Sequence, residues 1–195
     1  MLLTREQLQE RLFALHRASL DLVQDVSLET LLERIAATAC EQAGARYAAV
    51  GVLGEDGSLI KFVTVGMSNE DIRRIAHPPQ GHGLIRELMN SRHPLRLAVL
   101  QKHRHSVGFP DHHPHMSSFL GVPIISGEKQ LGQIYLTEKM DVREFTADDE
   151  MIIQMLATYA AKAIVNARLI DQMKERDAVL TRRNVDMSLL NGIAS

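Results

Sequence analysis

Residues 146–190 contain neither glycine nor proline, and this stretch constrains the fold more than any other part of the sequence. Thr146 with Asp149 resembles a capping box, with Asp in place of the usual Glu or Gln, and Phe145 stands where a hydrophobic staple would. The pattern predicts a single long helix that begins here. Because residues 151–170 are mostly apolar and small, we expect this part of the helix to pack on a sheet.

The later part of the helix, residues 171–190, is charged and leaves only a thin apolar seam. Ile170, Met173 and Leu180 form that seam, which Asp177 interrupts. A stripe of this width suits a partner helix. We therefore expect the helix to leave the domain and to continue as a signalling coiled coil.

The N-terminal residues 6–23 also form a predicted helix with a narrow apolar stripe. With Ser19 in the intervening seam position, four leucines keep a heptad's 4,3 spacing: Leu8, Leu12, Leu15 and Leu22. Both stripes are too narrow to be buried by a single domain and too apolar to stay in water. We expect a parallel homodimer in which the entering and leaving helices form one bundle.

Between these two helices the pattern predicts a small domain of strands and helices. A helix should run from Ser27, a plausible N-cap, to Gly44, because glycine is the residue that most often ends a helix. Two β-rich runs follow, "RYAAVGVLG" and "SLIKFVTVG", and "EDG" joins them as a hairpin signal. "SSFLGVPIIS" and "QLGQIYLTEK" are the clearest later strands, and shorter helices are expected at "SNEDIRRIA" and "LIRELMNSR". The predicted fold class is α+β, a central antiparallel sheet flanked by helices, with long N- and C-terminal signalling helices.

Charge and cysteine content narrow the classes of function. The formal net charge is -2 and the isoelectric point is near 6.5, so nucleic acid is not an expected partner. The N-terminus lacks the apolar core of a signal peptide, and no membrane-length apolar run occurs, which predicts a cytoplasmic protein. Cys40 is the only cysteine and is interpreted as core packing, which leaves histidine, carboxylate and hydroxyl groups to carry any chemistry.

Five of the nine histidines lie between His103 and His115, in a loop that is long for a compact domain. The stretch "SVGFPDHHPHM" places three of them around Pro114. A metal ion, a haem iron, a small organic molecule and no ligand at all are the alternatives that the loop leaves open. A zinc or nickel site of His112, His113 and His115 would lack the spacing of a known tetrahedral set.

The segment "TEKMDVREFTADDE" is similar to the NKFDE pattern of GAF domains, which are ligand-binding sensor modules commonly linked to their neighbours by long helices. Lys139, Phe145, Asp149 and Glu150 match the pattern, and Glu138 stands where Asn is usual. The resemblance implies the GAF fold and a structural ion pair between Lys139 and Asp149. The final "SLLNGIAS" looks like the opening of another GAF domain, which implies a downstream domain.

A closer resemblance is to the first, haem-binding GAF domain of the mycobacterial redox and oxygen sensor histidine kinases of the DosS/DosT type. "SVGFPDHHPHMSSFLGVPI", "GQIYLTEK", "FTADDE" and "NARLI" carry it, and it covers about residues 27–175. It implies haem b with His113 as the proximal iron ligand and Tyr135 on the distal side, where its hydroxyl could donate to bound O2. His112 and His115 are rival donors. Six apolar residues could wall the pocket: Phe109, Met116, Phe119, Leu120, Met89 and Leu84.

The expected organisation has three parts. Residues 1–26 would be an N-terminal dimerisation helix, residues 27–168 the GAF sensor domain, and residues 169–195 a coiled-coil linker helix that leads to a missing downstream domain. The parent protein is expected to be a sensor histidine kinase of a two-component system.

The leading hypothesis is a sensory GAF domain that binds haem b and senses O2, NO or CO, or reports the redox state of the iron. The alternative is a haem-free GAF domain that senses a small organic metabolite in the same pocket. A third possibility is a purely structural module that relays helix movements. No enzyme activity is expected of this chain, because a GAF methionine sulfoxide reductase needs reactive cysteines and Cys40 alone cannot supply them.

Overall fold

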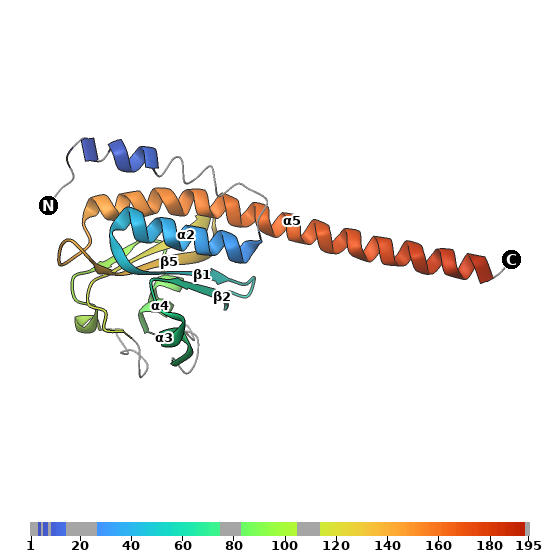
Figure 1. Ribbon diagram of the computed structural model, residues 1–195, viewed down its shortest axis with the longest axis horizontal. Helices are drawn as coiled ribbons and strands as arrows, with labels where there is room; N and C mark the ends of the chain where they lie inside the picture. Colours follow the sequence, from blue (N-terminus) through green and yellow to red (C-terminus); the bar gives the residue numbers. More distant parts are fainter. Residues whose placement is uncertain are drawn as a thin grey trace.

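Five strands form one antiparallel sheet at the centre of the part of the chain that the structure describes (Figure 1). The structure is a computed structural model, and it describes residue 4 and residues 6–7, 9–14, 27–74, 83–104 and 114–193. The strands lie in the order β2-β1-β5-β4-β3 across the sheet. Their bounds are Ala45–Leu53 for β1, Leu59–Val65 for β2, Leu95–Leu97 for β3, Phe119–Ser126 for β4 and Lys129–Lys139 for β5. The predicted α+β class with an antiparallel sheet is confirmed.

The helices cover the two faces of this sheet unequally (Figure 1). α2 (Leu28–Ala43) and α5 (Ala147–Ile193) lie side by side on one face and enclose the larger apolar core with the sheet. α3 (Asn69–Arg74) and α4 (Gly83–Met89) lie on the other face, where a smaller apolar cluster is buried. The 3-10 helix η1 (Leu100–Lys102) adds Leu100 to that cluster.

The boundaries of α2 follow from the chemistry at its two ends. The Oγ of Ser27 accepts a hydrogen bond of 3.3 Å from the backbone N–H of Thr30. Gly44 adopts the left-handed conformation, with φ of 56°, and its N–H donates to the carbonyls of Cys40 and Glu41. A residue with a side chain rarely adopts that conformation, so glycine ends the helix here. Both predicted boundaries are confirmed.

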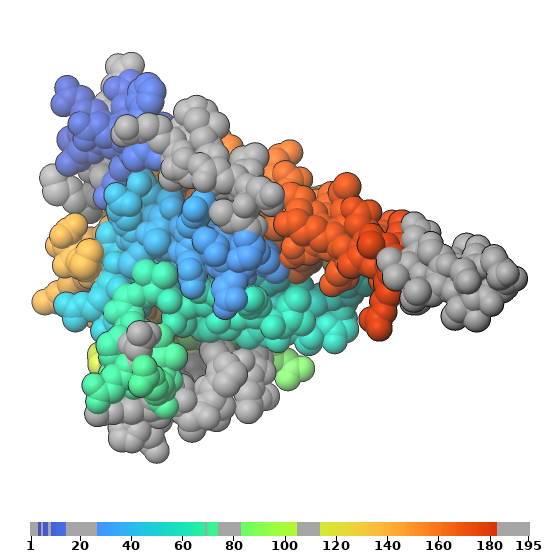
Figure 2. All heavy atoms as spheres, turned by 45° about the vertical axis from the view of Figure 1, so that its right-hand side comes forward, coloured from blue at the N-terminus to red at the C-terminus, as the bar shows by residue number. Residues whose placement is uncertain are grey.

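α5 begins with the predicted capping box. The N–H of Thr146 donates to Oδ2 of Asp149 at 2.8 Å, and the N–H of Asp149 donates to Oγ1 of Thr146 at 3.2 Å. Phe145 is fully buried. The helix then runs for 47 residues. Between residues 152 and 167 one side of the helix is buried in the domain, whereas every residue from 169 to 182 is exposed. The second part of α5 therefore leaves the domain, as predicted (Figure 2).

The N-terminal helix predicted over residues 6–23 is described in part. Residues 6–7 and 9–14 are helical, and Leu12 is half-buried. Leu8, Leu15, Ser19 and Leu22 of the predicted stripe lie outside the described residues. No helix in the described part of the chain is both long and apolar enough to cross a membrane.

Strand β5 lies in the middle of the sheet and distributes its side chains between the two faces. Ile134 and Leu136 belong to the larger core beneath α2 and α5, whereas Tyr135 belongs to the smaller cluster. Successive residues of a strand point to opposite faces. Gln133 therefore shares its face with Tyr135.

Candidate functional site

Tyr135 lies on the sheet face away from α2 and α5 and is almost completely buried. The rings of Phe62 on β2 and Phe119 on β4 flank it, with ring centroids 5.9 and 6.4 Å away. Its hydroxyl donates a hydrogen bond of 3.0 Å to Oε1 of Gln133, two residues earlier on the same strand. Burial raises the pKa of the Tyr135 hydroxyl above its ordinary value, so the group stays protonated and remains a donor.

Gln133 is fully buried on the central strand, yet only one end of its amide is paired. Oε1 accepts the hydrogen bond from Tyr135, whereas Nε2 has no hydrogen-bond partner among the described residues. Turning the amide over would leave an oxygen unpaired in place of the nitrogen. A buried polar group without a partner costs about 1–3 kcal/mol. The pair therefore offers an unused hydrogen-bonding group beside a buried phenol, which suits a ligand that carries polar atoms.

Glycines flank this pair on the two neighbouring strands. Gly51 lies opposite Gln133 on β1, and Gly121 lies opposite Tyr135 on β4. A Cβ on Gly121 would lie 2.5 Å from Cδ2 of Leu88. Leu88 of α4 thus packs directly onto the strand at this position and closes the sheet face beside Tyr135.

The structure brings three predicted pocket residues together and separates a fourth from them. Tyr135, Phe119 and Leu84 belong to one apolar cluster, whose other buried members are Ala49, Leu88 and Leu100. Leu120 belongs to the larger core on the opposite face. It follows Phe119 directly on β4, so the alternation of strand side chains sends it to α2 and α5. Leu120 therefore does not wall the same space as Tyr135.

Met116 and Met89, two other residues predicted to wall the pocket, are not among the described members of the apolar cluster around Tyr135. Met116 is buried, and its Sδ accepts a hydrogen bond of 3.0 Å from Oγ1 of Thr137. Met89 is half-buried at the last position of α4. Phe109 and the predicted proximal ligand, His113, lie outside the described residues.

The predicted histidine ligands fall largely outside the described chain as well. His115 is exposed, and His112 lies outside the described residues. Nδ1 of His103, at the start of the histidine-rich segment, lies 3.5 Å from Oε2 of Glu87 on α4. Within the ranges that the structure describes, no group of three or more His, Cys, Asp or Glu side chains is placed to hold a metal ion.

Sequence reasoning missed Gln133, Gly121 and Leu88 as parts of this face. The available signal was the two-residue spacing between Gln133 and Tyr135, which places both side chains on the same face of one strand. Leu88 lies in a helix whose packing partner cannot be found from periodicity alone.

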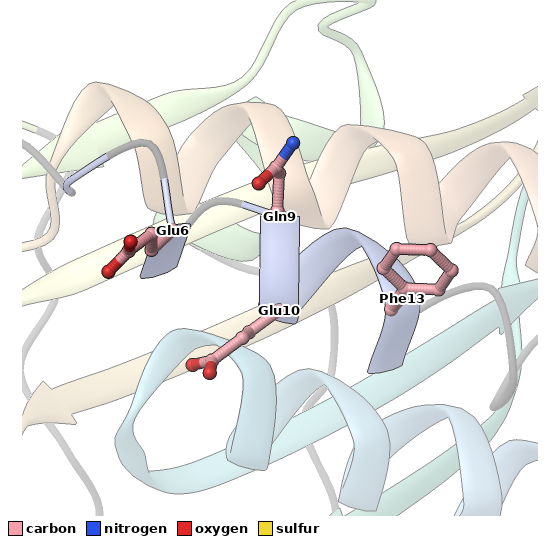
Figure 3. Close-up of a pocket in the computed structure, with 4 residues that line it drawn as sticks. All are labelled: Glu6, Gln9, Glu10 and Phe13. Atoms are coloured by element: carbon pink, nitrogen blue, oxygen red, sulfur yellow. The ribbon is translucent and has the colours of Figure 1, made fainter.

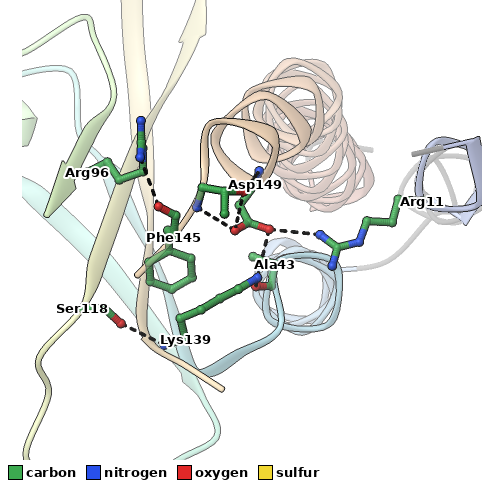
Figure 4. Close-up of polar contacts among 8 residues, drawn as sticks. Arg11, Ala43, Arg96, Ser118, Lys139, Phe145 and Asp149 are labelled. Carbon is green, nitrogen blue, oxygen red and sulfur yellow. Dashed lines mark hydrogen bonds and ion pairs between the residues drawn. The ribbon is translucent and has the colours of Figure 1, made fainter. Parts of the chain in front are cut away.

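The implied ion pair of Lys139 and Asp149 is present and buried at the end of β5 (Figure 4). Their Nζ and Oδ1 atoms lie 3.0 Å apart, and the same Nζ donates to the carbonyl of Ala43 at 2.7 Å. Burial alone would raise the pKa of Asp149, but hydrogen bonds from Thr146 and the charge of Lys139 outweigh it and hold the pKa below its ordinary value. Arg11 of the N-terminal helix also reaches Asp149, at 3.0 Å. The motif therefore joins the sheet, α2, α5 and the N-terminal helix.

Glu138 connects this corner to the segment that follows the histidine loop. It has a φ of 58°, in the left-handed region, where Asn is tolerated better than Glu. Its carboxylate accepts hydrogen bonds from the N–H of Ser117 and, at 2.9 Å, from the hydroxyl of Ser117. Its N–H donates to the carbonyl of Ser118 at 3.2 Å. These bonds account for a charged residue at the position where the GAF pattern usually has Asn.

Two surface hollows lie away from the Tyr135 face. One, of about 570 Å³, is lined only by residues of the N-terminal helix, whose side chains point in different directions (Figure 3): Glu6, Gln9, Glu10 and Phe13. The other has a volume of about 180 Å³ and is lined by Arg92, Pro94, Val122, Pro123, Ile125, Gln154, Ala157 and Thr158. Neither hollow gathers groups that point to a particular chemistry.

Comparison with known proteins identifies the fold independently. The family model of the GAF domain matches residues 25–165. Among solved structures, the GAF domain of a phosphoenolpyruvate-protein phosphotransferase from Coxiella burnetii superimposes with a TM-score of 0.72 at 22% identity. That match covers 85% of this chain and 98% of the other.

Two further solved structures show how widely this fold is used. Free methionine-R-sulfoxide reductase from Neisseria meningitidis, in complex with its substrate, matches with a TM-score of 0.67 and 13% identity, covering 87% of this chain and 97% of the other. The GAF domain of a protein assigned as a sensor histidine kinase from Pseudomonas syringae pv. tomato matches with a TM-score of 0.60 and 19% identity. That match covers 86% of this chain and 94% of the other. At these identities the likeness concerns the fold alone.

Proposed function

Because the chain belongs to the GAF family, whose members are sensory domains of signalling proteins such as histidine kinases, we propose that it is a cytoplasmic, non-enzymatic sensory domain. It binds a small ligand against Tyr135 and Gln133, on the sheet face away from α2 and α5. The parent protein is a sensor histidine kinase, and α5 leads from the domain toward its downstream part.

The unpaired amide of Gln133 carries this proposal. Gln133 is fully buried on the central strand, where a donor without a partner is costly. On the same face its side chain contacts the buried, protonated phenol of Tyr135. A ligand with an acceptor atom would pair with this group. If the Gln133 amide turned over, its Nε2 could donate to the Tyr135 oxygen, and the phenol proton would become available to the ligand.

The state of Cys40 supports a role without enzyme chemistry. Its Sγ donates a hydrogen bond of 2.9 Å to the carbonyl of Ala45, and burial raises the pKa of its thiol. A thiol is reactive as its thiolate, so both effects make Cys40 a poor nucleophile. The chain has no second cysteine to resolve an oxidised one.

Haem b is the first ligand that we propose. In its chemistry this face suits such a group, because Tyr135 can supply a hydroxyl donor within an apolar, partly aromatic lining once its bond to Gln133 is released. Its space suits haem only if Leu88 of α4 moves away from Gly121. His113 would hold the iron through an imidazole nitrogen. When bound, haem supplies an iron that takes O2, NO or CO or changes its redox state. The part of this chain is then to place the Tyr135 hydroxyl and to exclude water.

A haem-free ligand is the second candidate, and one observation favours it. Leu88 occupies the space beside Gly121, so the sheet face next to Tyr135 is closed to a large macrocycle unless α4 moves. A small organic metabolite with a carbonyl or carboxylate group needs less room. It would use the same two donors, Tyr135 and Gln133.

Absorption spectroscopy on protein purified with haem available separates the candidates. A Soret band is expected for the unaltered chain, and His113→Ala should abolish it, whereas His112→Ala and His115→Ala should keep it. Tyr135→Phe should keep haem and speed O2 dissociation by roughly twofold to tenfold, since a neutral hydrogen bond contributes about 0.5–1.5 kcal/mol. A normal Soret band in His113→Ala would reject the assignment of the iron ligand.

Without a Soret band, haem is rejected, and mass spectrometry of the extracted ligand tests for an organic occupant. Its retention should fall in Gln133→Leu. The matched control is Gln42→Leu, because Gln42 on α2 is another buried glutamine, and its amide oxygen has no hydrogen-bond partner among the described residues. Equal loss in both variants, or no occupant of either kind, would overturn the ligand site and favour a module that only relays helix movements.

A further inference from the structure

Helix α4 covers the face of the sheet that carries Tyr135 and Gln133 (Figure 1). Its two buried residues, Leu84 and Leu88, belong to the apolar cluster around Tyr135, and none of the described members of that cluster comes from α3. Leu88 is fully buried, and a Cβ on Gly121 would meet its Cδ2 at 2.5 Å. A ligand can therefore lie beside Tyr135 and Gly121 only after Leu88 has moved.

The packing of α4 is slight in comparison with that of the helices on the opposite face. It has seven residues, and a helix this short is not stable in water without contacts to other elements. It buries two side chains, whereas α2 and α5 share the larger core with the sheet. Elements with few buried apolar contacts open locally while the rest of a domain stays folded. The packing therefore favours opening of α4 before any opening of the opposite face.

One side chain from outside the helix holds the last turn of α4. Nε2 of Gln130, on β5, donates a hydrogen bond of 3.1 Å to the carbonyl of Leu88. The last carbonyls of a helix have no N–H partners within it, so a side-chain donor from another element stabilises that end. The bond ties the backbone of Leu88 to the strand that also carries Gln133 and Tyr135. It thus acts on the residue whose side chain closes this face.

Two further contacts limit how α4 can move. Nδ1 of His103, just after η1, lies 3.5 Å from Oε2 of Glu87. Beyond the helix, the guanidinium of Arg92 donates to the carbonyls of Gly127 and Glu128 at the β4–β5 turn, at 3.0 and 2.8 Å. Arg92 anchors the segment that joins α4 to β3, so a movement of α4 would turn about this point.

We propose that α4 is a lid over the Tyr135 face and that Gln130 is the latch that keeps it closed. When the bond from Gln130 to Leu88 breaks, the last turn of α4 is released and Leu88 can leave Gly121. Arg92 keeps the following segment in place. Gln130 is thus a positioning residue, which acts through Leu88 rather than on the ligand itself. The inference rests on the proposed function only for what enters beneath α4, because the lid can open without a ligand.

Thiol labelling measures how often the lid opens, and two neighbouring residues of β1 supply matched probes. Ala49 is buried in the cluster beneath α4, and Ala48 is buried in the larger core on the opposite face. In a Cys40→Ala background, Ala49→Cys and Ala48→Cys each give a chain with a single thiol. Iodoacetamide alkylates such a thiol as its thiolate and only where the thiol is accessible, and mass spectrometry follows the reaction.

The variant Gln130→Met removes the donor and keeps an unbranched side chain at this position. It should speed labelling at residue 49 by roughly twofold to tenfold, the effect of one net hydrogen bond on an opening equilibrium, and leave labelling at residue 48 unchanged. Gln130→Glu, which places a carboxylate against the Leu88 carbonyl, should speed labelling at residue 49 at least as much. Unchanged labelling at residue 49 in both variants, or equal acceleration at residues 48 and 49, would overturn the latch.

The labelling experiment uses iodoacetamide and no ligand, so its result is separate from that of the Soret test. Faster labelling at residue 49 alone supports the lid even where neither haem nor an organic occupant is found. Unchanged labelling rejects the lid even where a Soret band is present.

Discussion

The two faces of the sheet differ in the size of their apolar cores and in how completely their buried polar groups are paired. The face beneath α2 and α5 has an extensive apolar core, and the buried Lys139–Asp149 pair fixes the corner at its edge. The opposite face has a small cluster around Tyr135 and keeps the unpaired amide of Gln133. The comparison indicates that the first face supplies stability, while the second leaves a buried polar group without a partner among the described residues, which costs some stability.

Loss of the Asp149 carboxylate is the most severe test of the stabilising face. Asp149→Ala leaves Lys139 as an unpaired buried charge and removes the capping box, so we expect the free energy of unfolding to fall by about 3–5 kcal/mol. Glu150→Ala, the neighbouring control, breaks a half-exposed pair with Arg96 and should cost at most about 1 kcal/mol. Urea denaturation measures both variants, and similar losses would remove the special role of the buried pair.

Adjacent residues on β5 compare the two faces directly. Ile134→Ala creates a cavity beneath α2 and α5 and should cost about 2–5 kcal/mol. Tyr135→Phe removes one hydroxyl on the other face and leaves Oε1 of Gln133 without its partner, so it should cost less, about 1–3 kcal/mol. Thermal and urea unfolding of both variants would establish the order. If Tyr135→Phe were the more destabilising change, the division between the faces would be wrong.

Acid should weaken the stabilising face through Asp149. Its folded pKa lies below the unfolded value of about 4, so its contribution is present above that pH and is lost as the pH falls through the folded pKa. Urea midpoints measured between neutral pH and pH 2 should therefore fall for the unaltered chain. Asp149→Asn, which starts less stable, should lose less over the same interval. Parallel pH profiles would contradict the assignment.

The smallest expected effect belongs to the face that carries Tyr135 and Gln133. Replacing both partners of a buried hydrogen bond by apolar groups of similar shape is close to neutral. Gln133→Leu combined with Tyr135→Phe should therefore be within about 1 kcal/mol of the unaltered chain and no less stable than Tyr135→Phe alone. A double-mutant cycle by urea denaturation measures the coupling. A double variant much less stable than either single one would show that the polar pair is structural.

The sequence predicts the ends of the helices and the hairpin turn, because each of these is determined by residues that are close together in the chain. The caps at Ser27, Gly44 and Thr146 each depend on atoms a few positions away, and the hairpin depends on its turn. Tyr135 was found through the resemblance to a family, and its burial agrees with that expectation without testing the ligand. The burial of the Gln133 side chain could not be predicted from the residues next to it in the sequence. It arises because β1 and β4 lie on both sides of the central strand β5.

Leu120 shows a different kind of limit. The sequence analysis groups it with Phe119 as an apolar residue that could wall the pocket, although strand alternation sends the two side chains to opposite faces. The predicted strand already contained this information, and applying its period to each candidate would have separated the two residues. Apolar character alone is therefore a weaker guide to a pocket than the direction of each side chain.

The unbroken length of α5 has a mechanical consequence. With 47 residues at a rise of 1.5 Å each, the helix measures ~70 Å, and the part beyond residue 168 makes up ~38 Å of it. Treated as a rigid lever that pivots where it leaves the domain, this part turns a tilt of about 5° into a displacement of ~3 Å at its far end. Small movements of the domain where the helix leaves it can thus arrive amplified at the far end of α5.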